Sequence, residues 1–110
     1  MTCSAIVQAS GTGNAILVVE VELPEEDIDE FNRWYREEHG PFKLALPGYL
    51  GLRRFRAQDG SARFLALYEL STAAAAEDPG PMSPEDDATM QKLMSTWKDW
   101  ERIVWVEVAR

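Results

Sequence analysis

The stretch AILVVEVELPEEDIDEFNRWYREEHGP, residues 15–41, joins a predicted strand to a predicted helix. Residues 15–23 are rich in valine, isoleucine and leucine and end in alternating apolar and acidic side chains, which is typical of a strand. Pro24 and the acidic residues after it favour a helix start, because proline fits the first turn and negative charge complements the helix dipole. Gly40 and Pro41 predict that this helix ends at His39.

One face of the predicted helix is apolar or aromatic. With about 100° between successive residues, the stripe holds Ile28, Phe31, Tyr35 and His39. We expect the helix to pack on a sheet through this stripe. His39 would then face the sheet from the end of the helix, with Tyr35 one turn earlier and Asn32 two turns earlier.

The rest of the chain predicts three more strands and a second helix. Residues 49–57 and 62–70 form a predicted hairpin, whose turn over residues 58–61 contains an Asp-Gly pair. Residues 71–76 predict a short helical turn, and the prolines and glycine of residues 78–84 predict a loop. Residues 103–109 predict the last strand. Apolar residues at spacings of three and four predict a long helix from Asp86 to about Glu101; they are Met90, Leu93, Met94, Trp97 and Trp100.

This order of elements predicts a ferredoxin-like α+β fold, a βαββαβ sandwich with a four-stranded antiparallel sheet. Both helices would cover the same face of the sheet. The strands nevertheless carry apolar residues at both parities, as at Phe64 and Leu65 or at Val104 and Trp105. We therefore expect a homodimer in which the uncovered sheet faces pack together.

Length and composition limit the other possibilities. A chain of 110 residues and 12.4 kDa predicts one domain over residues 15–110 after a flexible tail over residues 1–14. A net charge of −8 argues against nucleic-acid binding. No apolar run is long enough to cross a membrane and no signal-peptide pattern is visible, so the expected location is cytoplasmic. With one cysteine, Cys3, and one histidine, no metal site is expected.

Three motifs carry a family resemblance. They are the helix end WYREEHGP at residues 34–41, the Pro47-Gly48 pair before the second strand, and the hairpin end LALYEL at residues 65–70. Together they resemble the dimeric α+β barrel superfamily, particularly its EthD-like group. The resemblance covers residues 15–109 and implies a small-molecule cavity between sheet and helices. Members include cofactor-independent monooxygenases, decarboxylases, cyclases, isomerases and haem enzymes, so the resemblance implies no single reaction.

His39 is the strongest candidate for chemistry, as a general acid or base. Tyr35 would polarise a substrate carbonyl, and Asn32 would orient His39 or the substrate, with no cofactor. The competing interpretation is that His39 is a half-solvated helix cap. Candidate substrate-binding residues are the aromatic residues Trp34, Phe64, Tyr68 and Trp97, together with Arg53 as a possible carboxylate anchor. Each could instead be an ordinary core or surface residue.

The candidate catalytic and substrate-binding residues together predict a lyase, isomerase or cyclase. Such an enzyme would move protons on a hydrophobic aromatic or polyketide-like carbonyl compound. The alternatives are a cofactor-independent monooxygenase and a non-catalytic ligand-binding dimer. Haem binding through His39 is a weaker alternative. The loop over residues 77–84 is expected to border the mouth of the cavity.

Overall fold

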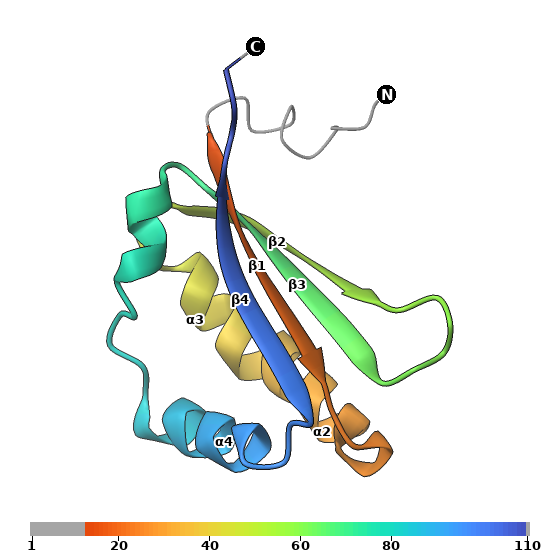
Figure 1. Ribbon diagram of the computed structural model, residues 1–110. Coiled ribbons are helices and arrows are strands. Elements are labelled where there is room, and N and C mark those ends of the chain that lie inside the picture. Colours follow the sequence, from red (N-terminus) through yellow and green to blue (C-terminus); the bar gives the residue numbers. More distant parts are fainter. Residues whose placement is uncertain (1–12, 110) are drawn as a thin grey trace.

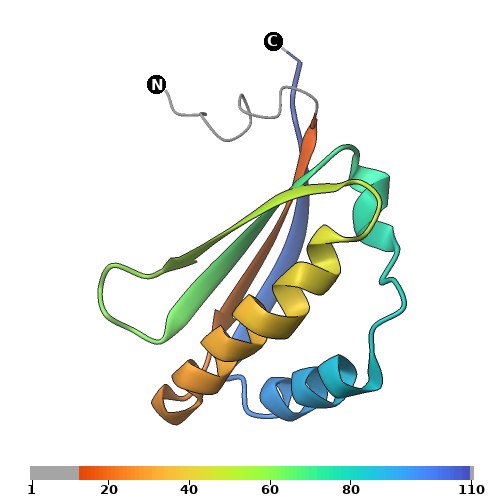
Figure 2. The ribbon, with the colours of Figure 1, turned by 180° about the vertical axis from the view of Figure 1, so that it is seen from behind.

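The structure, a computed structural model, describes residues 13–109, so most of the tail predicted over residues 1–14 lies outside the described residues. Four antiparallel strands form one sheet in the order β2-β3-β1-β4 (Figure 1). The strands are β1 (Ala15–Glu22), β2 (Tyr49–Arg56), β3 (Arg63–Leu70) and β4 (Asp99–Val106). The view from behind shows that the helices lie on one face of the sheet (Figure 2). The predicted ferredoxin-like α+β fold is confirmed.

The core lies between the helices and the central strands. Alternate residues of β1, such as Leu17 and Val21, are almost fully buried beneath the helices, as are Tyr68 and Leu70 of β3. Val21 pairs with Phe64 of β3, and paired residues point to the same face of a sheet. The apolar side chains of both strands therefore lie together on the covered face. The strand and hairpin predictions for residues 15–23, 49–57 and 62–70 are correct to within one residue at each end.

The first helical segment runs further than predicted. A short 3₁₀ turn, η1 (Glu25–Asp27), leads into α2 (Ile28–Trp34), a π-helical turn η2 (Tyr35–His39) and α3 (Gly40–Leu44). The prediction that the helix ends at His39 is therefore wrong. The backbone N–H of Gly40 donates to the carbonyl of Tyr35, five residues back. This wider turn accommodates Pro41, which lacks an N–H and would crowd the preceding turn of a regular α-helix.

The second predicted helix is shorter than expected. Helix α4 spans Pro84–Met94 rather than residues 86–101, and β4 begins at Asp99 rather than at residue 103. Ser83 caps α4 by accepting a hydrogen bond from the backbone N–H of Asp86, and Pro84 occupies the first helical position. After the helix, the N–H of Lys98 donates to the carbonyl of Glu22 at 2.8 Å, which begins the pairing of β4 with β1. Long-range strand pairing thus outweighs the helical spacing of the tryptophans.

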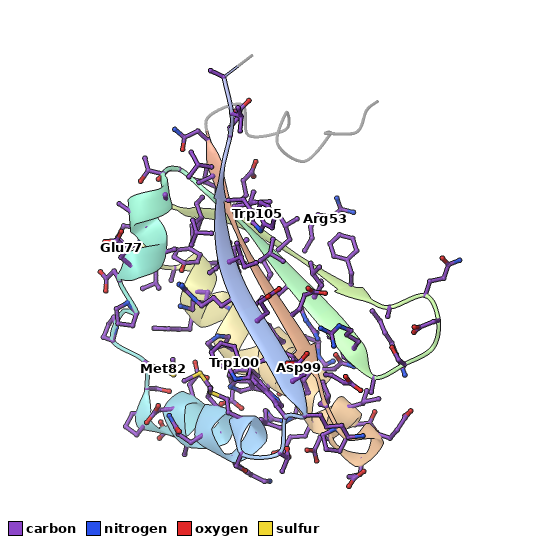
Figure 3. The ribbon with its side chains drawn as sticks, viewed as in Figure 1. Arg53, Glu77, Met82, Asp99, Trp100 and Trp105 are labelled. Atoms are coloured by element: carbon purple, nitrogen blue, oxygen red, sulfur yellow. The ribbon has the colours of Figure 1, made fainter. Side chains whose placement is uncertain are left out.

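The opposite face of the sheet is not covered by any described residue. Figure 3 labels Arg53 and Trp105, which belong to this face by strand parity, on the side away from the helices. Several apolar side chains of this face are exposed, among them Phe55 at 41%, Ile103 at 36% and Trp105 at 53%. An apolar surface of this kind is typical of an interaction face.

Candidate functional site

An open cavity of about 880 Å³ lies between the covered face of the sheet and the surrounding helical segments. Its volume falls in the range typical of small-molecule sites. The walls come from β1, α2, η2, α3, β3, α4, β4, the 3₁₀ turn η3 (Ala73–Glu77) and the loops that follow η3 and α4. Glu77, Met82 and Trp100, labelled in Figure 3, are lining residues from η3, that loop and β4. The loop expected over residues 77–84 therefore borders the cavity as predicted, through Glu77, Pro79 and Met82.

His39 is buried in the wall of this cavity, with 6% of its surface exposed. Its imidazole stacks on the indole of Trp34, with ring centroids 4.3 Å apart and planes inclined by 20°. Tyr35 packs edge-on against the same imidazole at 5.4 Å. His39 is thus an interior residue of the cavity wall, and its interpretation as a half-solvated helix cap is wrong.

A buried carboxylate lies behind His39. Asp86, near the start of α4, is 3% exposed, and its Oδ1 atom lies 3.5 Å from His39 Nδ1. The same oxygen accepts a 2.6 Å hydrogen bond from Trp34 Nε1. Because Nδ1 faces the carboxylate, we assign the proton of neutral His39 to Nδ1. Nε2 is then the basic nitrogen that remains for a ligand.

The protonation of His39 is set by its surroundings. Burial lowers the pKa of His39 to about 4, and the positive charge of Lys43 lowers it as well. The carboxylate of Asp86 acts in the opposite direction and favours the imidazolium. At neutral pH the side chain is therefore uncharged and able to accept a proton.

Two phenols complete the inner wall. Tyr68 donates a 3.4 Å hydrogen bond to the hydroxyl of Tyr35, and both side chains line the cavity. Burial raises the pKa of Tyr35 and the pKa of Tyr68, so both phenols are neutral at physiological pH. Since Tyr35 accepts from Tyr68, its own O–H is left to donate to another oxygen atom.

Five of the eight predicted site residues meet at this cavity: Trp34, Tyr35, His39, Tyr68 and Trp97. Asn32 does not join them. Its side chain accepts a 2.8 Å hydrogen bond from Arg54, and it lines a separate hollow between the helical segment and β2. The expected convergence of Asn32 with His39 is wrong, because residues seven positions apart do not share a stripe once the π turn changes the phase of the helix.

Phe64 and Arg53 also lie outside the cavity. Phe64 is a core residue that packs on Phe31 with ring centroids 5.5 Å apart. Arg53 is on the uncovered face of the sheet, where its guanidinium lies 4.9 Å from the ring centre of Phe55. The expectation that Arg53 anchors a substrate in this cavity is wrong, since strand parity places it on the opposite face.

Three charged residues at or behind the cavity were not predicted from the sequence. They are Asp86, Lys43 and Arg102. The Ser83-Pro84-Glu85-Asp86 pattern marks a helix start and contains Asp86, but nothing in it shows that the carboxylate faces His39. The helix end predicted at His39 left Lys43 outside the predicted helix, and Arg102 fell between the predicted second helix and the predicted last strand.

Two further features concern the described residues alone. Within residues 13–109, no group of three or more histidine, cysteine, aspartate or glutamate side chains is placed to hold a metal ion. Over the same residues, none of the helices has the length and apolar character that crossing a membrane requires.

Comparison with known proteins gives matches only at the level of structure. No protein-family model and no curated protein matches the sequence. Among solved structures, an antibiotic biosynthesis monooxygenase aligns with a TM-score of 0.69 at 17% identity, over 86% of this chain and 99% of that one. The chain shares its fold with this protein. Rv0793 from Mycobacterium tuberculosis aligns with a TM-score of 0.68 at 10% identity, over 87% and 96% of the two chains.

A third structure, PA3566 from Pseudomonas aeruginosa, has a TM-score of 0.68 at 13% identity, over 88% of this chain and 96% of that one. These TM-scores establish a common ferredoxin-like fold. The sequence identities are too low to indicate which reaction, if any, is shared. These structures do not show the EthD-like group that the sequence motifs suggest.

Proposed function

We propose that this chain is a small enzyme in which His39 abstracts a proton from a hydrophobic aromatic carbonyl compound. The observation that carries the proposal is a neutral, buried imidazole in the wall of an aromatic cavity, with a carboxylate 3.5 Å from its Nδ1 atom. A neutral imidazole has a free lone pair to accept a proton, and the neighbouring carboxylate offsets part of the cost of burying the imidazolium that forms. No cofactor takes part in the proposed step.

In the proposed step, Nε2 of His39 takes a proton from a carbon next to the substrate carbonyl. The C–H bond breaks, and its electron pair moves onto the carbonyl oxygen to give an enolate. Tyr35 donates its free O–H to that oxygen, and Asp86 stabilises the imidazolium through Nδ1. Return of the proton at another atom gives isomerase chemistry. Loss of a leaving group from the carbon next to the enolate gives a C=C bond and lyase chemistry, and attack of the enolate carbon on a second carbonyl of the same substrate, whose oxygen takes the proton, gives cyclase chemistry.

A second candidate is oxygenation of the same enolate. The antibiotic biosynthesis monooxygenase with the same fold favours it. In that reaction a CH₂ group and O₂ give a C=O group and water, and the substrate itself supplies the electrons. The shared first step makes the role of His39 the same in both candidates.

The test uses 2-tetralone, a bicyclic aromatic ketone with an acidic CH₂ group, in D₂O. We expect the protein to accelerate deuterium exchange at that carbon, measured by NMR, and His39→Gln to abolish the acceleration. Asp87→Asn changes an exposed carboxylate next to Asp86 and serves as the control. Equal exchange rates in wild type and His39→Gln would contradict the proposal. Oxygen uptake during the same reaction distinguishes the oxygenase from the isomerase type.

We also propose that the working form is a homodimer joined through the uncovered sheet face. Ile103 and Trp105 of β4 and Phe55 of β2 leave a substantial apolar area exposed in the single chain. In a twofold dimer, the same face of each copy packs against the other and removes this apolar area from water. Light scattering should then give about twice the chain mass of 12.4 kDa.

A further inference from the structure

Two cations lie at the cavity without an acidic partner. Lys43 of α3 and Arg102 of β4 both line it, and neither forms an ion pair with any carboxylate among residues 13–109. This is unexpected in a chain with 19 acidic and 11 basic residues. Lys43 is half-buried, and removing a charge from water is costly unless it has a partner, whereas Arg102 is exposed.

Contacts with the protein hold both cations in place. Arg102 donates a 2.6 Å hydrogen bond to the carbonyl of Ala76 in η3, which fixes its guanidinium against the wall. The ammonium of Lys43 lies 5.4 Å from the ring centre of Tyr49. Tyr49 is itself buried, and its hydroxyl has no hydrogen-bond partner among the described residues.

The two cations also influence one another. Burial lowers the pKa of Lys43, and the nearby positive charge of Arg102 lowers it further. The carboxylates of Asp86 and Asp78 raise the pKa of Lys43, but neither forms an ion pair with it. Asp78 accepts a hydrogen bond from the N–H of Gly80, and Asp86 accepts one from Trp34. Glu77 is an exposed residue at the edge of the cavity. An anion between Lys43 and Arg102 would relieve their repulsion.

We propose that Lys43 and Arg102 form a subsite that binds the carboxylate of an aromatic substrate. The inference rests on the proposed function and narrows its substrate class. Lys43 follows His39 by four residues on one helical segment, so their Cβ atoms are about one helical turn apart, roughly 5–6 Å. Both residues line the same cavity, so one substrate can carry its carboxylate on the same aromatic framework as the carbon that loses its proton.

Two probes of the same shape test the subsite, namely 1-naphthoate and its neutral amide, 1-naphthamide. We expect calorimetry at pH 7 to show binding of both, with naphthoate tighter by about tenfold or more, as a charge-assisted contact implies. Lys43→Met and Arg102→Gln should each remove most of this preference and leave naphthamide affinity within about threefold of wild type. The preference in wild type should also weaken as salt concentration rises.

Matched controls use cations away from the cavity. Lys98→Met and Arg56→Gln remove one exposed charge each, at positions that do not line the cavity, and should leave the preference intact. Equal binding of both probes by wild type, or an unchanged preference in Lys43→Met, would overturn the subsite and leave the cavity as a ligand site. Failure of wild type to bind either probe would count against both the subsite and the proposed aromatic ligand.

Discussion

The imidazole of His39 stacks on the indole of Trp34, five residues earlier, with ring centroids 4.3 Å apart. In a regular α-helix, residues five apart are separated by about 140° around the axis and do not stack. The π turn over Tyr35–His39 closes that angle and places both rings on the covered side. The π turn therefore creates the contact between His39, the proposed base, and the aromatic side chain of Trp34.

Gly40 is required for this π turn. A Cβ atom at Gly40 would lie 2.6 Å from the carbonyl oxygen of Tyr35, which is backbone and cannot move aside cheaply. We expect Gly40→Ala to destabilise the protein by about 1–3 kcal/mol, measured by urea denaturation. Gly51→Ala is the control, because its Cβ would meet only a glutamate side-chain atom at 3.6 Å. Equal stability of the two variants would show that the turn adapts.

The sequence predicts what local patterns determine. The alternation ending at Leu23 and the Asp59-Gly60 turn locate three strands, and the spacing of Phe31, Tyr35 and His39 locates a buried stripe. These signals suffice because each depends on residues close together in the chain.

The remaining errors come from contacts between distant residues. Trp97 and Trp100 have helical spacing and do pack together, at 6.4 Å, but from a loop and a strand. The partnership of Asp86 with His39 joins α4 to η2, and no local pattern encodes it. The π turn depends on Gly40 and Pro41, which by themselves are typical of a helix end.

The buried His39 predicts a specific loss of stability in acid. In the unfolded chain its pKa is near 6.5, whereas burial lowers it to about 4 in the fold despite the opposing charge of Asp86. Stability is therefore complete above pH 6.5 and falls as the pH drops toward 4, since only the unfolded state gains the proton. The loss should reach up to about 3 kcal/mol.

This loss is measured as the difference between wild type and His39→Gln in free energy of unfolding, at pH 7 and at pH 4. The comparison cancels the contribution of carboxylates, which both proteins share. We expect wild type to lose more stability than the variant over this interval. Parallel curves would mean that His39 titrates with an ordinary pKa.

We expect Asp86 to act on His39 as a positioning residue through their 3.5 Å contact, and NMR can follow this directly because His39 is the only histidine. Asp86→Asn removes the charge that favours the imidazolium, so the pKa of His39 should fall below its wild-type value. We also expect the turnover number to fall by about tenfold or more, with a smaller change in KM. Asp87→Asn should change neither. A loss of activity without a pKa change would indicate a purely structural role.

The proposed dimer predicts that a charge on the uncovered sheet face separates the subunits. Ile103→Asp places a carboxylate in the proposed interface, where an unpaired buried charge costs several kcal/mol. Light scattering should then report a single chain mass. Leu44→Asp changes a residue of α3 that is exposed to a similar extent, 43%, and should leave the mass doubled. A doubled mass for both variants would place the interface elsewhere.

The last prediction separates the base from the hydrogen-bond donor in the proposed proton transfer. His39→Gln removes the group that accepts the proton, so the rate of exchange with 2-tetralone should fall by about 10²–10⁴-fold. Tyr35→Phe keeps the ring that packs on His39 at 5.4 Å and removes only one donor to the enolate, so its cost should be smaller, about 10–10²-fold. Tyr68→Phe leaves the Tyr35 hydroxyl in place, although it removes the 3.4 Å hydrogen bond between the phenols, and should cost least. A larger loss in Tyr35→Phe than in His39→Gln would make Tyr35 the proton acceptor and His39 a residue that shapes the cavity.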